Sequence, residues 1–384
     1  MSRRVFILGS TGSIGRSTVE VIEHLRLIDG DGSWPVVGLS AGSNVTLLQE
    51  QAVSLGVDSV SIATEDSLDI EQVYATSEEL LRQHAKRGDV VVAAIVGFAG
   101  IAPVLTAIEC GCDIALANKE SLVAGGKIVM EAVREAGVTL LPVDSEHSAI
   151  YQALTNHPHH EIARITLTAS GGSLRTMPLE DLHNATVEQV LNHPTWDMGS
   201  KVTVDSASLM NKALELIEAH WLFGVSTQQL HAMIHPQSIV HGMVEFRDGS
   251  TIAQLSPPDM KLPIQYALTW PNRIQGCCNP VDWSTCSSLE FEPIDLNRYP
   301  AVRLAYEVIA LGGTAGAVFN AANEIVVEAF LEQSLPFGSM IGIVEEVLGN
   351  ISMSDHVTLD TVIRADAEAR KQATALIAST KVIS

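Results

Sequence analysis

Two carboxylates stand one residue apart at the end of an uncharged apolar run. Residues 138–143 read Val-Thr-Leu-Leu-Pro-Val, and Asp144, Ser145 and Glu146 follow directly. If the run is a strand, the side chains of Asp144 and Glu146 leave the same face at its carboxyl end. Like charges that close repel unless a cation lies between them, and hard divalent ions take carboxylate oxygens. The pair therefore predicts a metal site, with a solvated loop start as the alternative for so short a motif.

A further set of polar residues lies on a helix that we expect over residues 208–223. Asn211 and Glu215 are four residues apart and Lys212 and Glu215 are three apart, so the three side chains share one face. They could serve a metal and an anion, with an ordinary surface ion pair as the alternative. Residues 204–208, Val-Asp-Ser-Ala-Ser, add hydroxyl donors at the start of the same helix, where anions bind readily.

Two segments suit a phosphate group and a lid. Ser170, Gly171 and Gly172 follow an expected strand and can form a nest of backbone amides for phosphate. Residues 193–199 place a His, a Trp and a Met on a loop that ends in glycine, which predicts a lid that excludes water. We expect the isolated His235 and His241 to be structural.

A glycine-rich loop near the start of the chain indicates a nucleotide. Residues 9–15 read Gly-Ser-Thr-Gly-Ser-Ile-Gly and lie between an apolar strand at 5–8 and a periodic helix. Glycine permits a tight turn that lets a pyrophosphate reach the helix N-terminus. The second strand ends in Ser40, Ser43 and Asn44 without a carboxylate for the ribose hydroxyls, which favours NADP over NAD.

The elements that must hold these residues alternate between strand and helix. Strands are expected at residues 5–8, 36–40, 59–63, 90–96, 114–117 and 140–143, and this alternation predicts a parallel sheet covered on both faces. Lys119 and Glu120 follow one of these strands at the carboxyl edge, where such sheets bind ligands. A solvated helix start is the alternative for them.

Beyond residue 147 the pattern changes. A strand is expected at 165–168, and residues 238–246 and 250–256 flank an Asp-Gly turn, which predicts a hairpin. Residues 270–298 lack periodicity and resemble a linker. The remainder is predicted to form a small bundle of helices over residues 301–311, 317–333, 340–348 and 358–379.

Composition limits the classes of partner. The 384 residues are 46% hydrophobic and 18% charged, typical of a well-packed globular protein with two or three domains. A net charge of −22 without a basic run argues against nucleic acid. Five cysteines without zinc spacing suit reduced thiols in the cytoplasm, and no signal peptide is indicated. Residues 90–108 are uncharged, but Gly97, Gly100 and Pro103 interrupt them, so no membrane span is expected.

Seven motifs occur in one order along the chain: Gly-Ser-Thr-Gly-Ser-Ile-Gly, Ala-Asn-Lys-Glu-Ser, Pro-Val-Asp-Ser-Glu-His, Ala-Ser-Gly-Gly, His-Pro-Thr-Trp-Asp-Met-Gly, Val-Asp-Ser-Ala-Ser-Leu-Met-Asn-Lys and His-Pro-Gln-Ser-Ile-Val-His. This order resembles the 1-deoxy-D-xylulose 5-phosphate reductoisomerase family over nearly the whole chain. The resemblance implies an α/β fold with an N-terminal Rossmann-like doubly wound parallel sheet, a central α/β catalytic domain with a mixed sheet, and a C-terminal helical bundle. It implies an NADPH-binding domain at 1–147, a catalytic and dimerisation domain at 148–270, a linker at 271–297 and a helical domain at 298–384.

The resemblance also implies roles for individual residues. The metal ligands would be Asp144, Glu146 and Glu215, for Mg²⁺ or Mn²⁺, with Co²⁺ as a third candidate. Catalysis would involve these three with Lys119, Lys212 and His193. The substrate would contact Ser145, Glu146, Ser170, His193, Trp196, Met198, Ser206, Asn211, Lys212 and Glu215. The cofactor would contact Gly9, Ser10, Thr11, Gly12, Ser13, Ile14, Gly42, Ser43, Asn44, Asn118, Lys119, Glu120, Gly199 and Met260. Some relatives carry a basic residue where this chain has Ser43.

The implied reaction is a metal-dependent rearrangement of a phosphosugar followed by hydride transfer from NADPH, which yields 2-C-methyl-D-erythritol 4-phosphate for isoprenoid synthesis. The implied partners are that phosphosugar and a second copy of the chain, in the cytoplasm. The alternative activity is another NADP-dependent aldehyde or semialdehyde reductase, which in its thiol-dependent form needs an activated cysteine. A nucleotide-sensing module without catalysis is a third interpretation, and it leaves Asp144, Glu146 and Glu215 unexplained.

Overall fold

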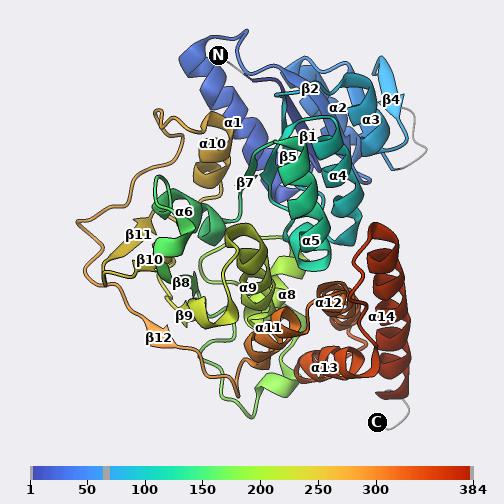
Figure 1. Cartoon of the computed structure of the whole chain (residues 1–384), viewed down its shortest axis with the longest axis vertical. Helices are drawn as coiled ribbons and strands as arrows, with labels where there is room; N and C mark the ends of the chain where they lie inside the picture. Colours follow the sequence, from blue (N-terminus) through green and yellow to red (C-terminus); the bar gives the residue numbers. More distant parts are fainter. Residues whose placement is uncertain (1–2, 64–69, 381–384) are drawn as a thin grey trace. The chain divides into compact units, whose positions relative to one another are not determined.

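The structure is a computed structural model that describes residues 3–63 and 70–380. It divides into two compact units, each built from several stretches of the chain. The first unit comprises residues 1–121, 129–151 and 259–280, and the second comprises residues 122–128, 152–258 and 281–384. Figure 1 labels the elements of both units along the chain.

Within the described residues, the first unit forms a seven-stranded sheet in which every strand pair is parallel, in the order β4-β3-β2-β1-β5-β6-β7. Its strands are β1 Val5–Leu8, β2 Val36–Ala41, β3 Ser59–Ile62, β4 Gln72–Tyr74, β5 Val90–Ala93, β6 Asp113–Leu116 and β7 Leu140–Pro142. The six strands predicted from sequence are present. The additional strand, β4, was not predicted because it is three residues long and carries no buried side chain.

Helices cover both faces of this sheet, as predicted. The helices that contact its strands are α1 Ser13–Asp29, α2 Val45–Leu55, α3 Ser77–His84, α4 Ile101–Glu109 and α10 Lys261–Thr269. The chain also forms α5 Lys119–Ala136, α6 Ser145–Ala153 and a 3-10 turn at Phe98–Gly100. Val5 and Ile7 of β1 face a core shared with α1, α2 and α10. Phe6 faces the other way, next to Gly38 and Leu80 of α3. Figure 1 shows α1 and α10 side by side, and the two helices are in contact.

The order of strands reverses at β1, whose neighbours are β2 and β5. In doubly wound sheets such a switch point leaves a crevice at the carboxyl ends of the strands, where ligands bind. The glycine loop follows β1 directly, so the fold puts it at this point.

The second unit contains a mixed sheet with the order β11-β10-β8-β9-β12. Its strands are β8 Ile162–Ala169, β9 Leu230–Ile234, β10 Val240–Phe246, β11 Thr251–Leu255 and β12 Glu292–Pro293. The strands β8 and β9 are parallel, and the other pairs are antiparallel. The predicted hairpin is confirmed, because β10 and β11 pair around a turn at Gly249, where φ is +86°.

Helices of the second unit are α7 Val187–Leu191, α8 Ser200–Ala207, α9 Met210–Phe223, α11 Pro300–Leu311, α12 Ala315–Leu331, α13 Met340–Asn350 and α14 Leu359–Thr380. Shorter 3-10 turns occupy His159–Glu161, Leu182–Asn184, Thr227–Gln229 and Phe337–Ser339. The predicted C-terminal bundle is confirmed, since α12 contacts α11, α13 and α14. Figure 1 draws these four helices in orange and red.

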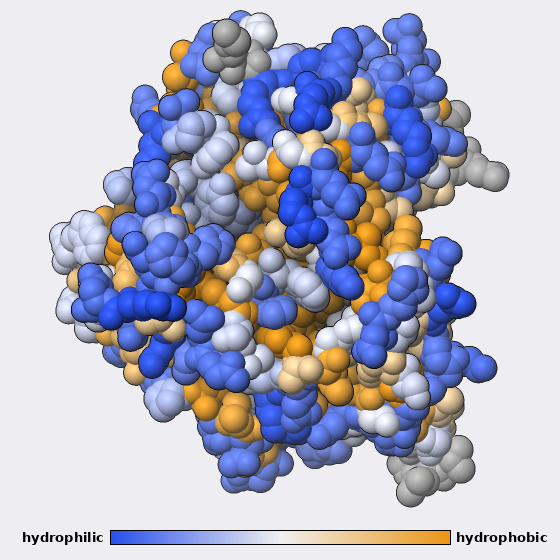
Figure 2. Space-filling view, in the orientation of Figure 1, coloured by the Kyte–Doolittle hydropathy of each residue, from blue (hydrophilic) through white to orange (hydrophobic). Residues whose placement is uncertain are grey.

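The segment predicted as a linker, residues 271–297, is irregular apart from β12. Hydrophilic residues cover much of the face shown in Figure 2, in keeping with 45 acidic and 23 basic residues. Among the helices described here, none has the length and apolar character needed to cross a bilayer.

Gly9 gives a test of the switch-point loop. Its φ is +82°, and a Cβ at this position would lie 2.5 Å from the carbonyl oxygen of Ala94. Gly9→Ala should lower the free energy of unfolding by about 2 kcal/mol or more, from backbone strain and overpacking together. Urea unfolding measures this change. Gly32→Ala is the control, because no atom lies within 4 Å of its Cβ position; equal midpoints for the two variants would contradict the argument.

Candidate active site

The glycine loop of the first unit is closed by backbone hydrogen bonds. The amides of Gly9 and Ser10 donate to the carbonyl oxygen of Ser40 at 3.0 and 2.8 Å. A Cβ on Gly15 would lie 2.4 Å from the carbonyl oxygen of Gly9, so the loop presses against α1. The helix begins after Gly12 without a side-chain cap or an acidic residue in its first turn. Its amides are therefore available to an anion.

The end of β2 matches the expectation for a phosphorylated ribose. Gly42, Ser43 and Asn44 are exposed just beyond the strand, and none of them is acidic. The Asn44 side chain accepts a hydrogen bond from the amide of Leu47 at 3.1 Å and caps α2. Ser43 is thus the exposed hydroxyl at this edge that a 2′-phosphate could meet.

Three consecutive polar residues open α5, and all three are buried. Asn118 caps the helix, accepts from the amide of Ser121 at 3.0 Å and donates to the Gly97 carbonyl at 3.0 Å. It also donates to Glu120 at 2.9 Å. Lys119 is 9% exposed, and its Nζ lies 2.5 Å from an oxygen of Asp144. The alternative of a solvated helix start is therefore wrong.

The strand geometry predicted for Asp144 and Glu146 is also wrong. The strand β7 ends at Pro142, and α6 begins at Ser145. The carbonyl of Asp144 accepts from the amide of Ser148 at 2.8 Å, so Asp144 stands at the start of the helix and Glu146 lies in its first turn. Residues 145–153 form a helix rather than continue the strand for two reasons. The helix buries Ala149 and Ile150, and carboxylates are favourable near a helix N-terminus.

The second unit holds the proposed phosphate nest. Gly171 and Gly172 have φ of +89° and +72°, which glycine adopts without strain. Ser170 Oγ accepts hydrogen bonds from the Gly172 amide at 3.2 Å and from His193 Nε2 at 3.0 Å. Both lone pairs of this hydroxyl are then engaged, which leaves its proton to donate to an anion. A Cβ on Gly172 would lie 2.4 Å from the carbonyl oxygen of Ser206, so the nest packs against the end of α8.

His193 is held in one tautomer. Its Nδ1 accepts hydrogen bonds from the amides of Thr195 and Trp196 at 3.1 and 3.0 Å. The ring proton therefore lies on Nε2, which donates to Ser170. Burial lowers the pKa of His193, so the ring is neutral at physiological pH. The loop at 193–199 is thereby tied to the nest at its first residue.

The polar face of α9 is buried. Asn211 Nδ2 donates to Glu215 at 2.5 Å, and the other oxygen of Glu215 pairs with Lys212 Nζ. Glu215 is 0% exposed and Lys212 is 2% exposed, so the alternative of a surface ion pair is wrong. The helix begins at Met210 rather than at residue 208, because Leu209 takes a φ of +54° between α8 and α9.

Residues predicted as one site thus belong to both units. Asp144, Glu146 and Lys119 belong to the first unit, and the nest, the lid and α9 belong to the second. Two further residues that were predicted to contact the cofactor stand at helix starts, Met260 before α10 and Gly199 before α8. Met260 packs against the core of the first unit.

Family models match three consecutive parts of the chain. They are described as 1-deoxy-D-xylulose 5-phosphate reductoisomerase over residues 5–126, as its C-terminal domain over 140–223, and as the DXP reductoisomerase C-terminal domain over 255–372. The 1-deoxy-D-xylulose 5-phosphate reductoisomerase of Pelodictyon phaeoclathratiforme is 45% identical over 98% of this chain and 100% of its own length. The chain belongs to the 1-deoxy-D-xylulose 5-phosphate reductoisomerase family.

Other members of this reductoisomerase family agree with the assignment. The enzyme of Prosthecochloris aestuarii is 46% identical over 96% of this chain and 98% of its own. The solved structure of the Zymomonas mobilis enzyme in complex with NADPH has a TM-score of 0.89 at 40% identity and covers 98% of this chain and 99% of its own. A DOX-P reductoisomerase in complex with NADPH, fosmidomycin and magnesium has a TM-score of 0.90 at 36% identity, with 99% of both chains covered.

The cysteines give no support to the alternative of a reductase with a thiol nucleophile. All five are free. Burial raises the pKa of Cys112 to about 12 and also raises the pKa values of Cys110, Cys277 and Cys278. A nucleophilic thiol needs a lowered pKa, so the chemistry of this reductoisomerase family is favoured.

His235 and His241 are predicted to be structural, and the contacts of His235 agree with this prediction. Its Nε2 accepts from the amides of Ile239 and Val240, and its Nδ1 donates to the Glu290 carbonyl. His241 makes a contact that the sequence does not predict: its ring lies edge-on to Trp196 of the lid loop, with 6.1 Å between centroids. A lone histidine in a strand gives no sequence signal for such a contact.

His241 makes stability depend on pH. Burial, and to a lesser degree Lys212 and His235, lower its pKa to about 4, against the opposing carbonyls of Ser256 and Pro257. The unfolded chain takes up this proton near pH 6.5. Between pH 6.5 and 4 the unfolded state therefore binds more protons, and stability falls as the pH falls.

From pH 7 to pH 5 we expect His241 to account for a loss of about 2 kcal/mol in the free energy of unfolding. His241→Gln should remove that part of the pH dependence, which urea unfolding at the two pH values measures. His231→Gln, on an exposed position of β9, should retain it. Identical pH dependence in the two variants would exclude His241 as the source.

Proposed function

We propose that this chain converts 1-deoxy-D-xylulose 5-phosphate into 2-C-methyl-D-erythritol 4-phosphate in the non-mevalonate isoprenoid pathway, with a divalent metal and NADPH. The observation that carries the proposal is the buried Glu215 with Asn211 and Lys212 around it. A fully buried charged set costs free energy and has no role in a simple core. Its residue types suit a metal ion and the oxygens of a sugar.

The first unit fits NADPH. Its loop leaves helix amides unoccupied by side chains, and its glycines let backbone approach where a Cβ would clash. The residues that would hold the cofactor are Gly9, Ser10, Thr11, Gly12, Ser13, Ile14, Gly42, Ser43, Asn44, Asn118, Lys119, Glu120, Gly199 and Met260. When bound, NADPH would supply the hydride that reduces the rearranged aldehyde.

The carboxylates fit a hard divalent ion. We propose Asp144, Glu146 and Glu215 as ligands of Mg²⁺ or Mn²⁺, with Co²⁺ as a further candidate. Each unit contributes a carboxylate that a lysine partly neutralises, Asp144 with Lys119 and Glu215 with Lys212. Such a lysine limits the repulsion between carboxylates that share one ion. When bound, the ion would polarise the ketose carbonyl as a Lewis acid.

The remaining residues would bind, orient and enclose the substrate. Ser170, Ser206, Asn211 and Lys212 would donate to the phosphate end, and Ser145, Asn211 and Lys212 to the hydroxyl and carbonyl oxygens. The neutral His193 would keep the Ser170 proton directed at the phosphate. Trp196 and Met198 on the loop would exclude water, with phosphate binding as the source of free energy for closure.

We also propose how these tasks divide along the chain. NADPH would bind to residues 1–147, and catalysis and dimerisation would belong to residues 148–270. The segment 271–297 would be a linker to the C-terminal helices at 298–384, which would support the catalytic part. Met260 packs with the glycine-loop unit, which supports its place among the cofactor contacts. The five free thiols support a cytoplasmic enzyme.

The purified chain should oxidise NADPH when 1-deoxy-D-xylulose 5-phosphate and Mg²⁺ or Mn²⁺ are both present. Glu215→Gln should lose at least about 100-fold in kcat, since loss of a residue that only hydrogen-bonds to a metal ligand already costs about 10- to 100-fold. Its NADPH affinity should stay unchanged, because the glycine loop lies in the other unit. Absorbance at 340 nm measures turnover, and fluorescence titration measures NADPH binding.

Glu328→Gln provides the control, because Glu328 is an exposed carboxylate on α12 and its variant should keep full activity. Turnover that does not depend on the metal would refute the proposed function. Full activity in Glu215→Gln would instead remove only Glu215 from the set of metal ligands.

We further propose a homodimer that uses the edge strand β11. This strand is outermost in the sheet of the second unit, and its Ile252 is 39% exposed. An exposed edge offers unpaired backbone groups to another strand.

Light scattering at micromolar concentration should give twice the chain mass of 41.1 kDa. Ile252→Lys should shift the protein towards the monomer, because a charge at the edge opposes pairing. Leu27→Lys should not, although Leu27 is 83% exposed on α1. A monomeric unmodified protein would contradict the dimer.

A further inference from the structure

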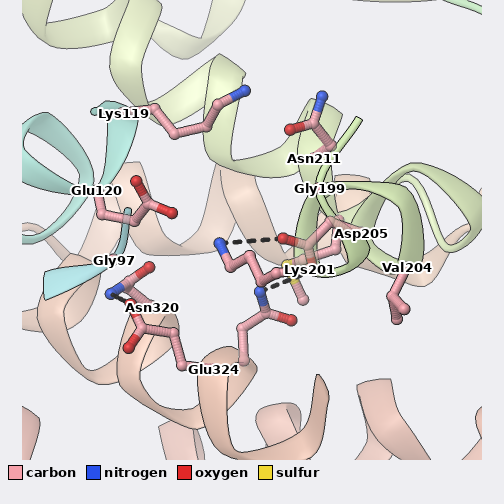
Figure 3. A network of polar contacts seen from close by, with 12 residues as sticks. Gly97, Lys119, Glu120, Gly199, Lys201, Val204, Asp205, Asn211, Asn320 and Glu324 are labelled. Carbon is pink, nitrogen blue, oxygen red and sulfur yellow. Dashed lines mark hydrogen bonds and ion pairs between the residues drawn. The ribbon is translucent and has the colours of Figure 1, made fainter. Parts of the chain in front are cut away.

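A buried carboxylate on α8 is contacted by donors from two helices, α12 and α8 itself. Asp205 is 1% exposed, and one of its oxygens accepts a hydrogen bond from Asn323 Nδ2 of α12 at 2.9 Å. Its other oxygen lies 3.1 Å from Lys201 Nζ, one turn earlier on α8. Figure 3 shows the Lys201 ammonium directed at the Asp205 carboxylate. Asn323 itself is 0% exposed.

These two contacts constrain α8 in different ways. The pair of Lys201 and Asp205 joins residues one turn apart within α8, whereas the bond from Asn323 ties α8 to a separate helix. An ionised carboxylate is costly to bury unless donors surround it. The helix α8 is therefore most stable in the position where both Lys201 and Asn323 reach Asp205. Asn323 therefore sets where α8 lies against α12.

The position of α8 matters because both of its ends adjoin the proposed substrate site. Its N-terminal cap is Gly199, the last residue of the lid loop, and Thr203 Oγ1 bonds back to the Gly199 carbonyl at 3.1 Å. Its last turn carries Ser206, whose carbonyl packs against Gly172 of the phosphate nest. A shift of α8 would move the lid and the nest together.

We propose that Asn323, acting through Asp205 and Lys201, is a positioning residue that fixes α8 so that Ser206, the nest and the lid loop match the phosphate end of the substrate. This inference rests on the proposed function and adds to it a residue from the C-terminal bundle. Asn323 touches neither the nest nor the lid in the contacts described, so its effect passes through α8.

The same helix offers a matched control. Arg370 of α14 binds Glu324 of α12 at 2.6 Å and Asp366 at 2.7 Å. Arg370→Met removes a polar contact between α12 and α14, whereas Asn323→Leu removes one between α12 and α8 at nearly constant volume. General loosening of the bundle would affect both variants, but displacement of α8 would affect only Asn323→Leu.

We expect Asn323→Leu to raise the KM for 1-deoxy-D-xylulose 5-phosphate at least 10-fold. Amide hydrogen exchange over residues 200–208 should accelerate at least 10-fold. The dissociation constant for inorganic phosphate, measured by calorimetry, should rise by a similar factor. Arg370→Met should lower the melting temperature and leave all three quantities within twofold.

An unchanged KM for the phosphosugar in Asn323→Leu, or similar effects in the two variants, would overturn the proposal. If Asn323→Leu does not fold, Asn323→Ala decides in its place, because it removes the same Nδ2 donor without adding an apolar side chain against Asp205. An unchanged phosphate dissociation constant and unchanged exchange over 200–208 in that variant would also overturn it. Amide hydrogen exchange and phosphate binding do not require turnover. They therefore test the role of Asn323 even if the unmodified protein does not convert the phosphosugar and the proposed function is refuted.

Discussion

Burial of charge in opposite pairs is the constraint on which the rest of the structure depends. Lys119 with Asp144, Lys201 with Asp205 and Lys212 with Glu215 all lie largely out of water. Removal of one partner from such a pair costs about 3–5 kcal/mol, because the remaining charge is left without compensation. Lys119 therefore limits where α5 can lie relative to Asp144, whereas in α8 and α9 both partners of each pair must be buried on the same face of the helix.

The fold meets this constraint by placing charges at helix ends. Lys119 opens α5, Asp144 stands before α6 and Glu146 lies in its first turn. Carboxylates at a helix N-terminus gain from the partial positive charge of the unpaired amides. A strand end would offer neither that charge nor a turn that separates the two carboxylates. The geometry expected from sequence was wrong for this electrostatic reason.

Local patterns predicted most of the elements, since buried runs such as Val90–Ala93 and the Asp-Gly hairpin depend on near neighbours in sequence. Burial of charge could not be predicted in the same way. Lys212 and Glu215 have the spacing of a surface pair, and only tertiary packing buries them. Asn323 and Asp205 are 118 residues apart, and no periodicity relates them. The edge-on contact of His241 with Trp196 likewise depends on tertiary structure.

The ion pairs also determine how a strongly acidic chain can hold a phosphate. With a net charge of −22, long-range electrostatics repel an anion, and Lys201 is already engaged by Asp205. In the proposed site, Lys212 would be helped by short-range donors that carry no net charge: the amides around Gly172 and the Ser170 hydroxyl, which the neutral His193 orients. Such donors act only over hydrogen-bond distances and in a narrow range of angles. The proposed phosphate site would therefore depend on the accurate placement of α8 and the nest more than on the number of cations nearby.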